Sequence, residues 1–282
     1  MRVLVVGAGG QLGRALVASC PRQVELLALT RADCDITDGD AVLRAVGSFS
    51  PDVIINAAAY TAVDKAEEDE EGARLINVGA VEHLVEAARR SDARVVHVST
   101  DFVFSGLGSI PYRPSDEVGP VSVYGRTKLE GERVLGKEDL VVRTAWVYDA
   151  DGANFMNTML RLFATRDEVR VVSDQIGTPT FAGDLADAIW RLVDTRATGV
   201  LHYTNAGVAS WYDFAVAIKE EALAIGVLQS DVTIVPIPSE DYPTPARRPH
   251  FSVLDCRDTY SLIGGPARHW RAALRNVLKD RT

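Results

Sequence analysis

Short apolar runs recur along the first half of the chain. They lie at residues 3–6, 24–29, 53–56, 94–98 and 140–144. These runs do not alternate strictly between apolar and polar residues, which is typical of strands covered on both faces in a parallel sheet. The pattern therefore predicts a core of parallel strands.

Segments with helical spacing separate these strands. One helix is expected from the glycine-rich turn at 7–13 through Ala18, and another from about Gly39 to Val46 with Asp38 as its N-cap. Between Asn77 and Arg90 the apolar residues recur with the period of a helix. The alternation of strands and helices predicts an α/β fold built on a doubly wound (Rossmann) parallel sheet.

The strand rhythm loosens beyond about Ala150, where helical patterns dominate. The expected helices are Asn154–Ala164, Phe181–Asp194 and Trp211–Leu223. Three tryptophans in helix-like stretches are expected to make core contacts or contacts within a second lobe, namely Trp190, Trp211 and Trp270.

Composition and charge exclude several classes of function. The chain is 47% hydrophobic and carries a formal net charge of -9 without a sustained Lys/Arg run, which argues against nucleic-acid and membrane partners. Cys20, Cys34 and Cys256 lack CxxC spacing, as is typical of reduced thiols in a cytosolic protein. No apolar run is long enough for a membrane span or a signal peptide. A soluble, cytoplasmic protein with a small-molecule partner is expected.

A glycine-rich loop joins the first strand to the first helix. Gly7, Gly10 and Gly13 give the spacing GxxGxxG, since Leu12 occupies the last position that GxGxxG requires. Glycines here allow a tight turn, close approach of backbone N–H groups to a pyrophosphate, and packing of helix on strand. The loop predicts a dinucleotide site in which Gln11 and Leu12 lie at the helix N-terminus; the alternative is a plain flexible turn.

The ends of the next two strands would form the rest of the cofactor site. The second strand ends at Thr30 and Arg31, so this place lacks the carboxylate that would bind the ribose 2′-hydroxyl of NAD. Arg31 could instead bind the 2′-phosphate of NADP, which favours NADP over NAD. The alternative is that Arg31 is a solvated loop residue. Asp35 and Ile36 could border the adenine. The third strand ends in small residues that would let a ligand lie against the backbone, namely Ala57, Ala58 and Ala59.

Polar residues follow the fourth strand at Ser99, Thr100 and Asp101. In an α/β sheet the ligand site lies at these carboxyl ends, so Thr100 could donate a hydrogen bond to a substrate oxygen. The alternative is a strand-end turn in which a hydroxyl caps backbone groups.

Tyr124 and Lys128 stand four residues apart in a segment that is expected to be helical. This spacing places both side chains on one face, where an ammonium group would lower the pKa of the phenol toward neutrality. A tyrosine with such a pKa could pass a proton during turnover. The alternative is a surface tyrosine beside a solvated lysine.

These motifs, in this order, make the chain resemble the extended short-chain dehydrogenase/reductase superfamily. Within that superfamily it is similar to the dTDP-4-dehydrorhamnose reductase family over essentially its whole length. The segments that carry this closer resemblance are residues 9–13, 56–66 (NAAAYTAVDKA), 98–104 (VSTDFVF), 143–148 (RTAWVY), 174–180 (DQIGTPT) and 242–249 (YPTPARRP).

The resemblance implies a reaction and roles for individual residues. The reaction would reduce the 4-keto group of dTDP-4-dehydro-6-deoxy-L-mannose to dTDP-L-rhamnose with NADPH, or with NADH. Thr100, Tyr124 and Lys128 would be catalytic, and Ser99, Tyr124 and Lys128 would also contact the cofactor. The predicted substrate contacts are Thr61, Val63, Thr100, Asp101, Tyr124, Trp146 and Arg247. Arg247 and its neighbour Arg248 could pair with the diphosphate or lie in a solvated loop, and Trp146 could instead be a core residue.

The resemblance also implies a division of the chain and an assembly. Residues 1–149 would bind the dinucleotide, and residues 150–282 would form mainly a smaller α/β substrate-binding lobe, with segments that could return to the sheet. Some family members dimerise through magnesium held by glutamates, but those places hold Ala15 and Gly183 here. No required metal and a monomer or weak homodimer are therefore expected. Other readings are another sugar-nucleotide reductase or epimerase of the superfamily, or a non-catalytic dinucleotide-binding regulatory subunit.

Overall fold

The structure is a computed structural model that describes residues 1–229 and 231–280. Its centre is a six-stranded parallel sheet in the order β10-β5-β4-β3-β1-β2. The strands of this sheet are β1 (Arg2–Val6), β2 (Glu25–Leu29), β3 (Val53–Asn56), β4 (Arg94–Thr100), β5 (Leu140–Thr144) and β10 (Gly199–His202). The prediction of a doubly wound parallel sheet is confirmed.

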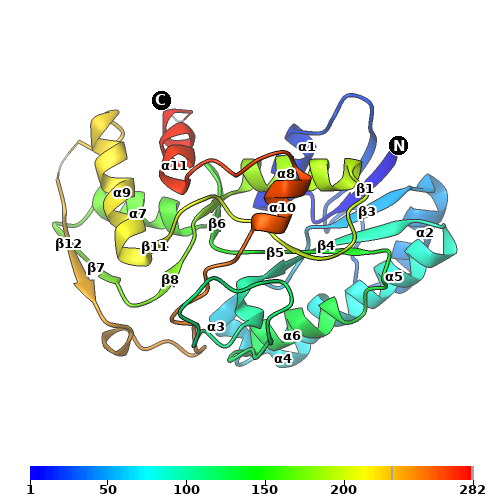
Figure 1. Cartoon of the computed structure of the whole chain (residues 1–282), viewed down its shortest axis with the longest axis horizontal. Helices are drawn as coiled ribbons and strands as arrows, with labels where there is room; N and C mark the ends of the chain where they lie inside the picture. Colours follow the sequence, from blue (N-terminus) through cyan, green and yellow to red (C-terminus); the bar gives the residue numbers. More distant parts are fainter. Residues whose placement is uncertain (230, 281–282) are drawn as a thin grey trace.

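Helices cover both faces of this sheet (Figure 1). The covering helices are α1 (Gln11–Ala18) and α8 (Ala182–Asp194) on one face, and α2 (Gly39–Phe49), α5 (Ala80–Arg90) and α6 (Val123–Glu132) on the other. Within β1, Val3 and Val5 pack in the core beneath α1 and α8, whereas Leu4 and Val6 pack beneath α2 and α5. Because both faces are buried, the strands need no alternation of apolar and polar residues.

The strand order places a ligand site at the carboxyl ends of β1 and β3. The chain runs outward from β1 to β2 and then crosses back to β3 on the other side of β1. At such a reversal the two connections leave in opposite directions, and a crevice remains outside the strand ends. The glycine-rich loop follows β1 at this point, and Ala57 to Ala59 follow β3.

The connection between β3 and α5 is less regular than the sequence predicts. It contains α3 (Val63–Ala66), α4 (Glu70–Arg74) and a π-helical turn, η1 (Leu75–Gly79), which runs directly into α5. The helix predicted from Asn77 therefore begins as a π-helix. Asn77 is buried there, where its side chain bonds both the backbone of Tyr60 and the Thr127 hydroxyl. A short 3-10 helix, η2 (Asp101–Val103), follows β4.

The second half of the chain forms a smaller α/β lobe beside the sheet (Figure 1). It also supplies the strand β10 to the six-stranded sheet and the helix α8 that covers one of its faces. The lobe core contains Met156, Phe163, Phe214 and Leu274. Its elements are α7 (Phe155–Phe163), α9 (Trp211–Ala224) and α11 (Trp270–Lys279), with the strand pairs β7 (Glu168–Val172) with β12 (Thr233–Ile237), β6 (Val147–Tyr148) with β9 (Thr180–Phe181), and β8 (Ile176–Gly177) with β11 (Ala209–Ser210). Two short helices complete the chain, η3 (Ser239–Asp241) and α10 (Arg257–Leu262).

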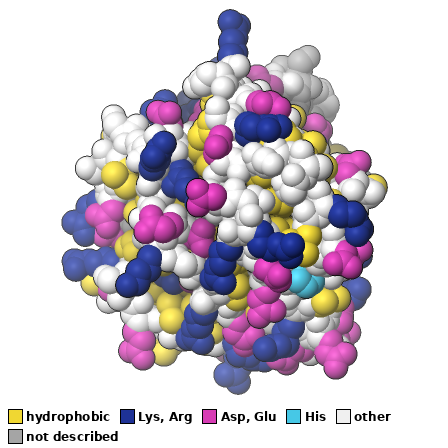
Figure 2. Space-filling view, turned by 90° about the vertical axis from the view of Figure 1, so that its right-hand side faces the viewer, with side chains coloured by type: hydrophobic (Ala, Val, Ile, Leu, Met, Phe, Trp, Pro, Cys, Tyr) yellow, Lys and Arg dark blue, Asp and Glu magenta, His cyan; other side chains and the backbone are white. Residues whose placement is uncertain are grey.

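The surface carries charges of both signs. Figure 2 shows Lys and Arg side chains intermixed with Asp and Glu over one face of the molecule, with only scattered apolar side chains. Such mixing gives that face no extended basic field of the kind that attracts nucleic acid. Within residues 1–229 and 231–280, no helix is long and apolar enough to cross a membrane.

Candidate active site

A cavity of about 880 Å³ opens between the carboxyl ends of the strands and the lobe. Its size is in the range of small-molecule and cofactor sites, which is roughly 300–1,000 Å³. The predicted site residues that line it are Gly7, Gly10, Gln11, Leu12, Arg31, Asp35, Ile36, Ala57, Ala58, Ala59, Thr61, Val63, Ser99, Thr100, Asp101, Tyr124, Lys128 and Trp146. Gly13 and Arg247 are not part of this lining.

The glycine-rich loop has the geometry of a phosphate cradle. Gly7 has a φ of +78°, and the Gly10 N–H donates to its carbonyl at 3.0 Å. A Cβ atom on Gly7 would lie 2.5 Å from the Ala58 nitrogen, so only glycine lets β1 and β3 end this close together. Gly10 caps α1 without a side-chain hydrogen bond, which leaves the first backbone N–H groups of the helix for an anion.

Gly13 does not line the cavity, but it packs against the glycine-rich loop at Gly7. A Cβ atom there would lie 2.1 Å from the Gly7 carbonyl oxygen, so we expect Gly13→Ala to push α1 away from β1. The expected results are a loss of about 1–3 kcal/mol of stability and an NADPH affinity lower by about tenfold or more. Thermal unfolding and a fluorescence titration with NADPH measure both quantities.

Gly47→Ala is the matched control for this substitution. Gly47 is exposed in α2, and a Cβ atom there would meet nothing within 4 Å. Alanine should leave NADPH binding unchanged and stabilise the helix by about 0.5–1 kcal/mol. Equal behaviour of the two variants would show that Gly13 has no role in the cradle.

The loop after β2 forms the far end of the cavity. The Asp33 carboxylate accepts hydrogen bonds from the Thr30 N–H at 2.9 Å and the Thr30 hydroxyl at 2.6 Å, which fixes the turn and lowers the pKa of Asp33. The side chain of Arg31 is 82% exposed and lies 3.7 Å from Asp35 in a weak ion pair. Its guanidinium group can therefore reorient toward a ligand at little cost.

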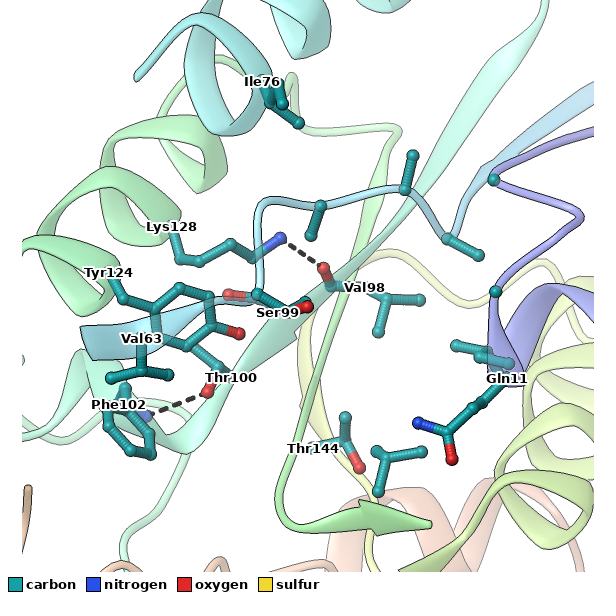
Figure 3. Close-up of a pocket in the computed structure, with 18 of the residues that line it drawn as sticks. Gln11, Val63, Ile76, Val98, Ser99, Thr100, Phe102, Tyr124, Lys128 and Thr144 are labelled. Atoms are coloured by element: carbon teal, nitrogen blue, oxygen red, sulfur yellow. Dashed lines mark hydrogen bonds between the residues drawn. The ribbon is translucent and has the colours of Figure 1, made fainter. Parts of the chain in front are cut away.

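Tyr124 lies in the first turn of α6, where an N-cap hydrogen bond fixes the start of the helix. The Ser122 hydroxyl caps this helix by accepting from the Gly125 N–H at 3.2 Å. The edge of the Phe102 ring packs against the Tyr124 ring, with 5.5 Å between the centroids. Figure 3 shows Tyr124, Thr100 and Lys128 converging from α6 and the end of β4, with Gln11 of α1 facing them across the cavity.

Thr100 has the capping role predicted for it as a strand-end residue, and it also lies in the cavity lining. It caps η2, where its hydroxyl oxygen accepts from the Phe102 N–H at 3.2 Å, and it also lines the cavity. The hydroxyl donates to the Asp101 carboxylate at 3.0 Å. Burial raises the pKa of Asp101 to about 6, although hydrogen bonds from Ser252 and Thr100 oppose this shift.

The pKa of Tyr124 differs from the sequence-based expectation. Burial raises it to about 12, with a smaller opposing effect from the Thr100 hydrogen bond and a further increase from the Asp101 charge. The predicted lowering of this pKa by Lys128 is therefore wrong for the chain by itself. Tyr124 remains a phenol through the neutral pH range, so it can donate a proton.

The amino group of Lys128 is bound to β4. Its side chain is buried, and Nζ donates to the Val98 carbonyl oxygen at 2.7 Å and lies 3.1 Å from His97 Nε2. Burial lowers the pKa of Lys128 to about 8, while the charge of Glu132 opposes this shift. His97 has no role predicted from the sequence; the available signal was a polar residue within a buried strand.

Two tryptophans form the wall on the lobe side. The rings of Trp146 and Trp211 stack with their centroids 3.6 Å apart and an angle of 8° between their planes. Trp146 has a φ of +49°, which is an uncommon backbone conformation for a residue other than glycine. A Cβ atom on Gly177 would lie 2.6 Å from the indole ring of Trp146, so only glycine leaves room for the ring at this place. Trp211 was predicted only as a core or lobe contact, but it lines the cavity. Trp190 and Trp270 are buried, as predicted.

Arg248, and not Arg247, reaches the cavity. Arg247 is exposed, whereas the Arg248 guanidinium group is half-buried in the lining and forms an ion pair with Asp64 at 2.7 Å. Asp64 thereby ties the loop before Phe251 to α3, near Thr61 and Val63. Among the described residues, no group of three or more His, Cys, Asp and Glu could hold a metal ion.

Comparison with known proteins identifies the family. A family model described as the RmlD substrate binding domain matches residues 1–282. The dTDP-4-dehydrorhamnose reductase of Aggregatibacter actinomycetemcomitans is 43% identical over 287 residues, which cover 98% of both chains. The chain belongs to the dTDP-4-dehydrorhamnose reductase family. The resemblance in the sequence is thus confirmed.

Solved structures of the family share the fold closely. That of the dTDP-4-dehydrorhamnose reductase from Clostridium acetobutylicum has a TM-score of 0.94 and 41% identity, and the match covers 100% of this chain and 99% of that chain. That of the Bacillus anthracis dTDP-4-dehydrorhamnose reductase in complex with NADP has a TM-score of 0.93 and 33% identity, with 99% of each chain covered.

Proposed function

We propose that the protein catalyses the NAD(P)H-dependent reduction of the 4-keto group of dTDP-4-dehydro-6-deoxy-L-mannose to dTDP-L-rhamnose, the last step of dTDP-rhamnose biosynthesis. The observation that carries the proposal is the convergence of Tyr124, Thr100 and Lys128 on one cavity with the glycine-rich cradle, in a chain of this family. Full-length relatives with the reductase name support it.

The proposed chemistry needs one hydride and one proton. The nicotinamide supplies the hydride to C4 when it is bound. Tyr124 donates its phenolic proton to the ketone oxygen, and a pKa of about 12 supports the presence of that proton at neutral pH. Thr100 orients the carbonyl group through its hydroxyl. Lys128 holds the nicotinamide ribose and stabilises the charge left on Tyr124 after transfer.

The proposed cofactor is NADPH, with NADH as a possible substitute. The support is the NADP in the Bacillus anthracis relative and the cation at Arg31. If Arg31 pairs with the 2′-phosphate, Arg31→Ala should raise the KM for NADPH by about tenfold or more, because a charge-assisted hydrogen bond contributes about 1.5–3 kcal/mol. The KM for NADH should not change, because NADH lacks this phosphate.

Arg22→Ala controls for the loss of a surface cation. Arg22 is also exposed and precedes β2, but it is not part of the cavity lining. Steady-state kinetics with both cofactors should show no change in this variant. An equal change in both cofactors for Arg31→Ala would remove Arg31 from the phosphate site.

The proposed assembly follows from two positions at which some family members carry glutamates that bind magnesium. Ala15 and Gly183 supply no ligand, so we propose a monomer or weak homodimer without a required metal. We also propose that residues 1–149 bind mainly the cofactor and residues 150–282 mainly the dTDP-sugar, in the cytoplasm, without nucleic-acid or membrane partners. The contributions of α8 and β10 to the sheet make this division approximate.

The test is an absorbance assay at the reduced-nicotinamide band with dTDP-4-dehydro-6-deoxy-L-mannose and NADPH or NADH. We expect stoichiometric oxidation of the cofactor with formation of dTDP-L-rhamnose. An epimerase would recycle its cofactor and show no stoichiometric consumption. A regulatory subunit would bind the dinucleotide without turnover. No signal loss with either cofactor would exclude the reductase.

A further inference from the structure

The loop between β6 and α7, residues 149–154, lies against the N-terminal end of α1. The guanidinium group of Arg14 donates to the Asp151 carbonyl oxygen of this loop at 3.4 Å. A Cβ atom on Gly152, which lines the cavity, would lie 3.5 Å from Gln11 Cγ. A segment that leads into the lobe therefore contacts the glycine-rich cradle.

Asn154, at the end of this loop, makes three hydrogen bonds with its side-chain amide. Oδ1 caps α7 by accepting from the Asn157 N–H at 2.9 Å. Nδ2 donates to the Asp149 carbonyl oxygen at 2.9 Å and to Gln11 Oε1 at 2.8 Å. A backbone N–H can only donate and a backbone carbonyl can only accept, so these two backbone partners fix which way the Asn154 amide is turned.

The orientation of Asn154 determines that of Gln11. The NH₂ group of Asn154 can only donate, so the amide atom of Gln11 that faces it must be the oxygen. Figure 3 shows the nitrogen of the Gln11 amide turned toward the side of the cavity that carries Thr100 and Tyr124. Within residues 1–229 and 231–280, this nitrogen has no hydrogen-bond partner. Gln11 thus offers its N–H donors to a ligand.

The place of Gln11 in the cavity indicates which ligand group receives these donors. Gln11 is the first residue of α1, beside the backbone N–H groups of the phosphate cradle. A dinucleotide that reaches from Arg31 to Tyr124 must pass this point with its diphosphate, and Gln11 faces the Tyr124 side. An amide N–H strengthens binding of an anionic phosphate oxygen, whereas an amide oxygen at the same place would repel it.

We propose that Asn154 is a positioning residue for the cofactor: it holds the Gln11 amide with its NH₂ group directed at the nicotinamide-side phosphate of NADPH. The inference rests on the proposed function for the identity of this cofactor. The hydrogen bond joins residues 143 positions apart, one in the cradle and one at the start of a lobe helix. The lobe thereby contributes to cofactor binding as well as to substrate binding.

Asn154→Asp tests this role because it keeps the cap and removes the donor. Asp caps a helix as well as Asn does, so α7 and the melting temperature should change little. The carboxylate cannot donate, so Gln11 would turn its NH₂ group toward it and present Oε1 to the phosphate. In a fluorescence titration the Kd for NADPH should rise by about tenfold or more. Asn276→Asp, with the same charge on an exposed part of α11, should leave this Kd unchanged.

A shorter ligand separates this contact from a general disturbance of the site. The ligand 2′,5′-ADP carries the adenosine end of NADPH but lacks the nicotinamide-side phosphate. Its affinity, measured by calorimetry, should be the same for the unaltered chain and for Asn154→Asp. An equal loss of affinity for NADPH and 2′,5′-ADP would overturn the proposal. In steady-state kinetics, the KM for NADPH should rise with a smaller change in kcat.

A double-mutant cycle separates the effect through Gln11 from a direct effect of the new charge. Gln11→Met removes the amide at similar volume and should itself raise the Kd for NADPH by about tenfold. In the Gln11→Met background, Asn154→Asp should have little further effect, because no amide remains to be turned. If its full effect persists there, the carboxylate acts on the phosphate through space and the proposed role is wrong.

Gln11→Glu decides the question if Asn154→Asp does not fold. One glutamate oxygen can still accept from Asn154, and the other then takes the place proposed for the NH₂ group, so the Kd for NADPH should rise by about tenfold or more. An unchanged Kd would overturn the proposal and leave the reductase function intact. If the unaltered chain binds NADPH with these variant effects but does not reduce the keto sugar, the proposed function fails and the role of Asn154 stands.

Discussion

Replacing Tyr124 by phenylalanine is expected to lower kcat by about 10²-fold or more, because the reaction loses its proton donor. The ring can keep its edge-on contact with Phe102, so the fold and the cavity shape should persist. The hydroxyl that is removed lies beside Thr100, on the wall opposite the glycine-rich cradle. NADPH affinity should therefore stay close to that of the unaltered protein. Single-turnover kinetics and a fluorescence titration separate these two effects.

Tyr242→Phe is the matched control for the loss of a phenolic hydroxyl. Tyr242 is 60% exposed and is not part of the cavity lining, so its replacement should leave both quantities unchanged. Near-normal turnover in Tyr124→Phe would show that another group protonates the ketone. Asp101 would then be the first candidate, since its pKa of about 6 lets it hold a proton near neutrality.

Replacing Glu132 by glutamine is expected to lower the free energy of unfolding by about 3–5 kcal/mol, because it leaves a buried charge without its partner. The Glu132 and Arg143 side chains are each 5% exposed and form a bidentate pair with contacts of 2.7 and 2.9 Å. Ser99, directly before Thr100, also donates to Glu132. Chemical denaturation with matched m-values measures the loss.

Two further variants test whether the unpaired charge is the cause. Glu86→Gln removes one partner of an exposed pair with Arg90, whose side chains are 63% and 65% exposed, and should change stability by less than about 0.5 kcal/mol. Glu132→Leu/Arg143→Met removes both buried charges and should recover much of the lost stability. A double variant as unstable as Glu132→Gln would assign the effect to packing instead.

The elements that the sequence predicted best are those that depend on local pattern. The apolar runs at 53–56 and 140–144 coincide with β3 and β5, and the helices near Asn154, Phe181 and Trp211 are also present. Burial on both faces favours apolar residues at successive positions of a strand, so the signal is strong over a few residues. The π-helical start of the segment at Asn77 was missed, because tertiary hydrogen bonds of that side chain accompany it.

The site was predicted where ligand-facing residues follow strand ends, and missed where they arrive from distant segments. Ala57, Thr100 and Tyr124 lie in the cavity as expected. Trp211 could not be placed there from the sequence, and Arg248 could not be told apart from its neighbour Arg247, because the segments that carry them reach the cavity through contacts far apart in the sequence. Their catalytic or binding roles, like those of the other lining residues, stay predictions until the variants are measured.

The sequence by itself determined the doubly wound sheet, the glycine-rich cradle and the pair Tyr124 and Lys128, because periodicity and short-range spacing encode them. Only the tertiary structure decided the protonation of that pair. Burial raises the pKa of Tyr124 to about 12 and lowers that of Lys128 to about 8, and the burial results from the packing of α6 on β4. The same packing places His97 of β4 at 3.1 Å from Lys128 Nζ. Desolvation and hydrogen-bond direction depend on which residues surround a group in space, and spacing along the chain does not report them.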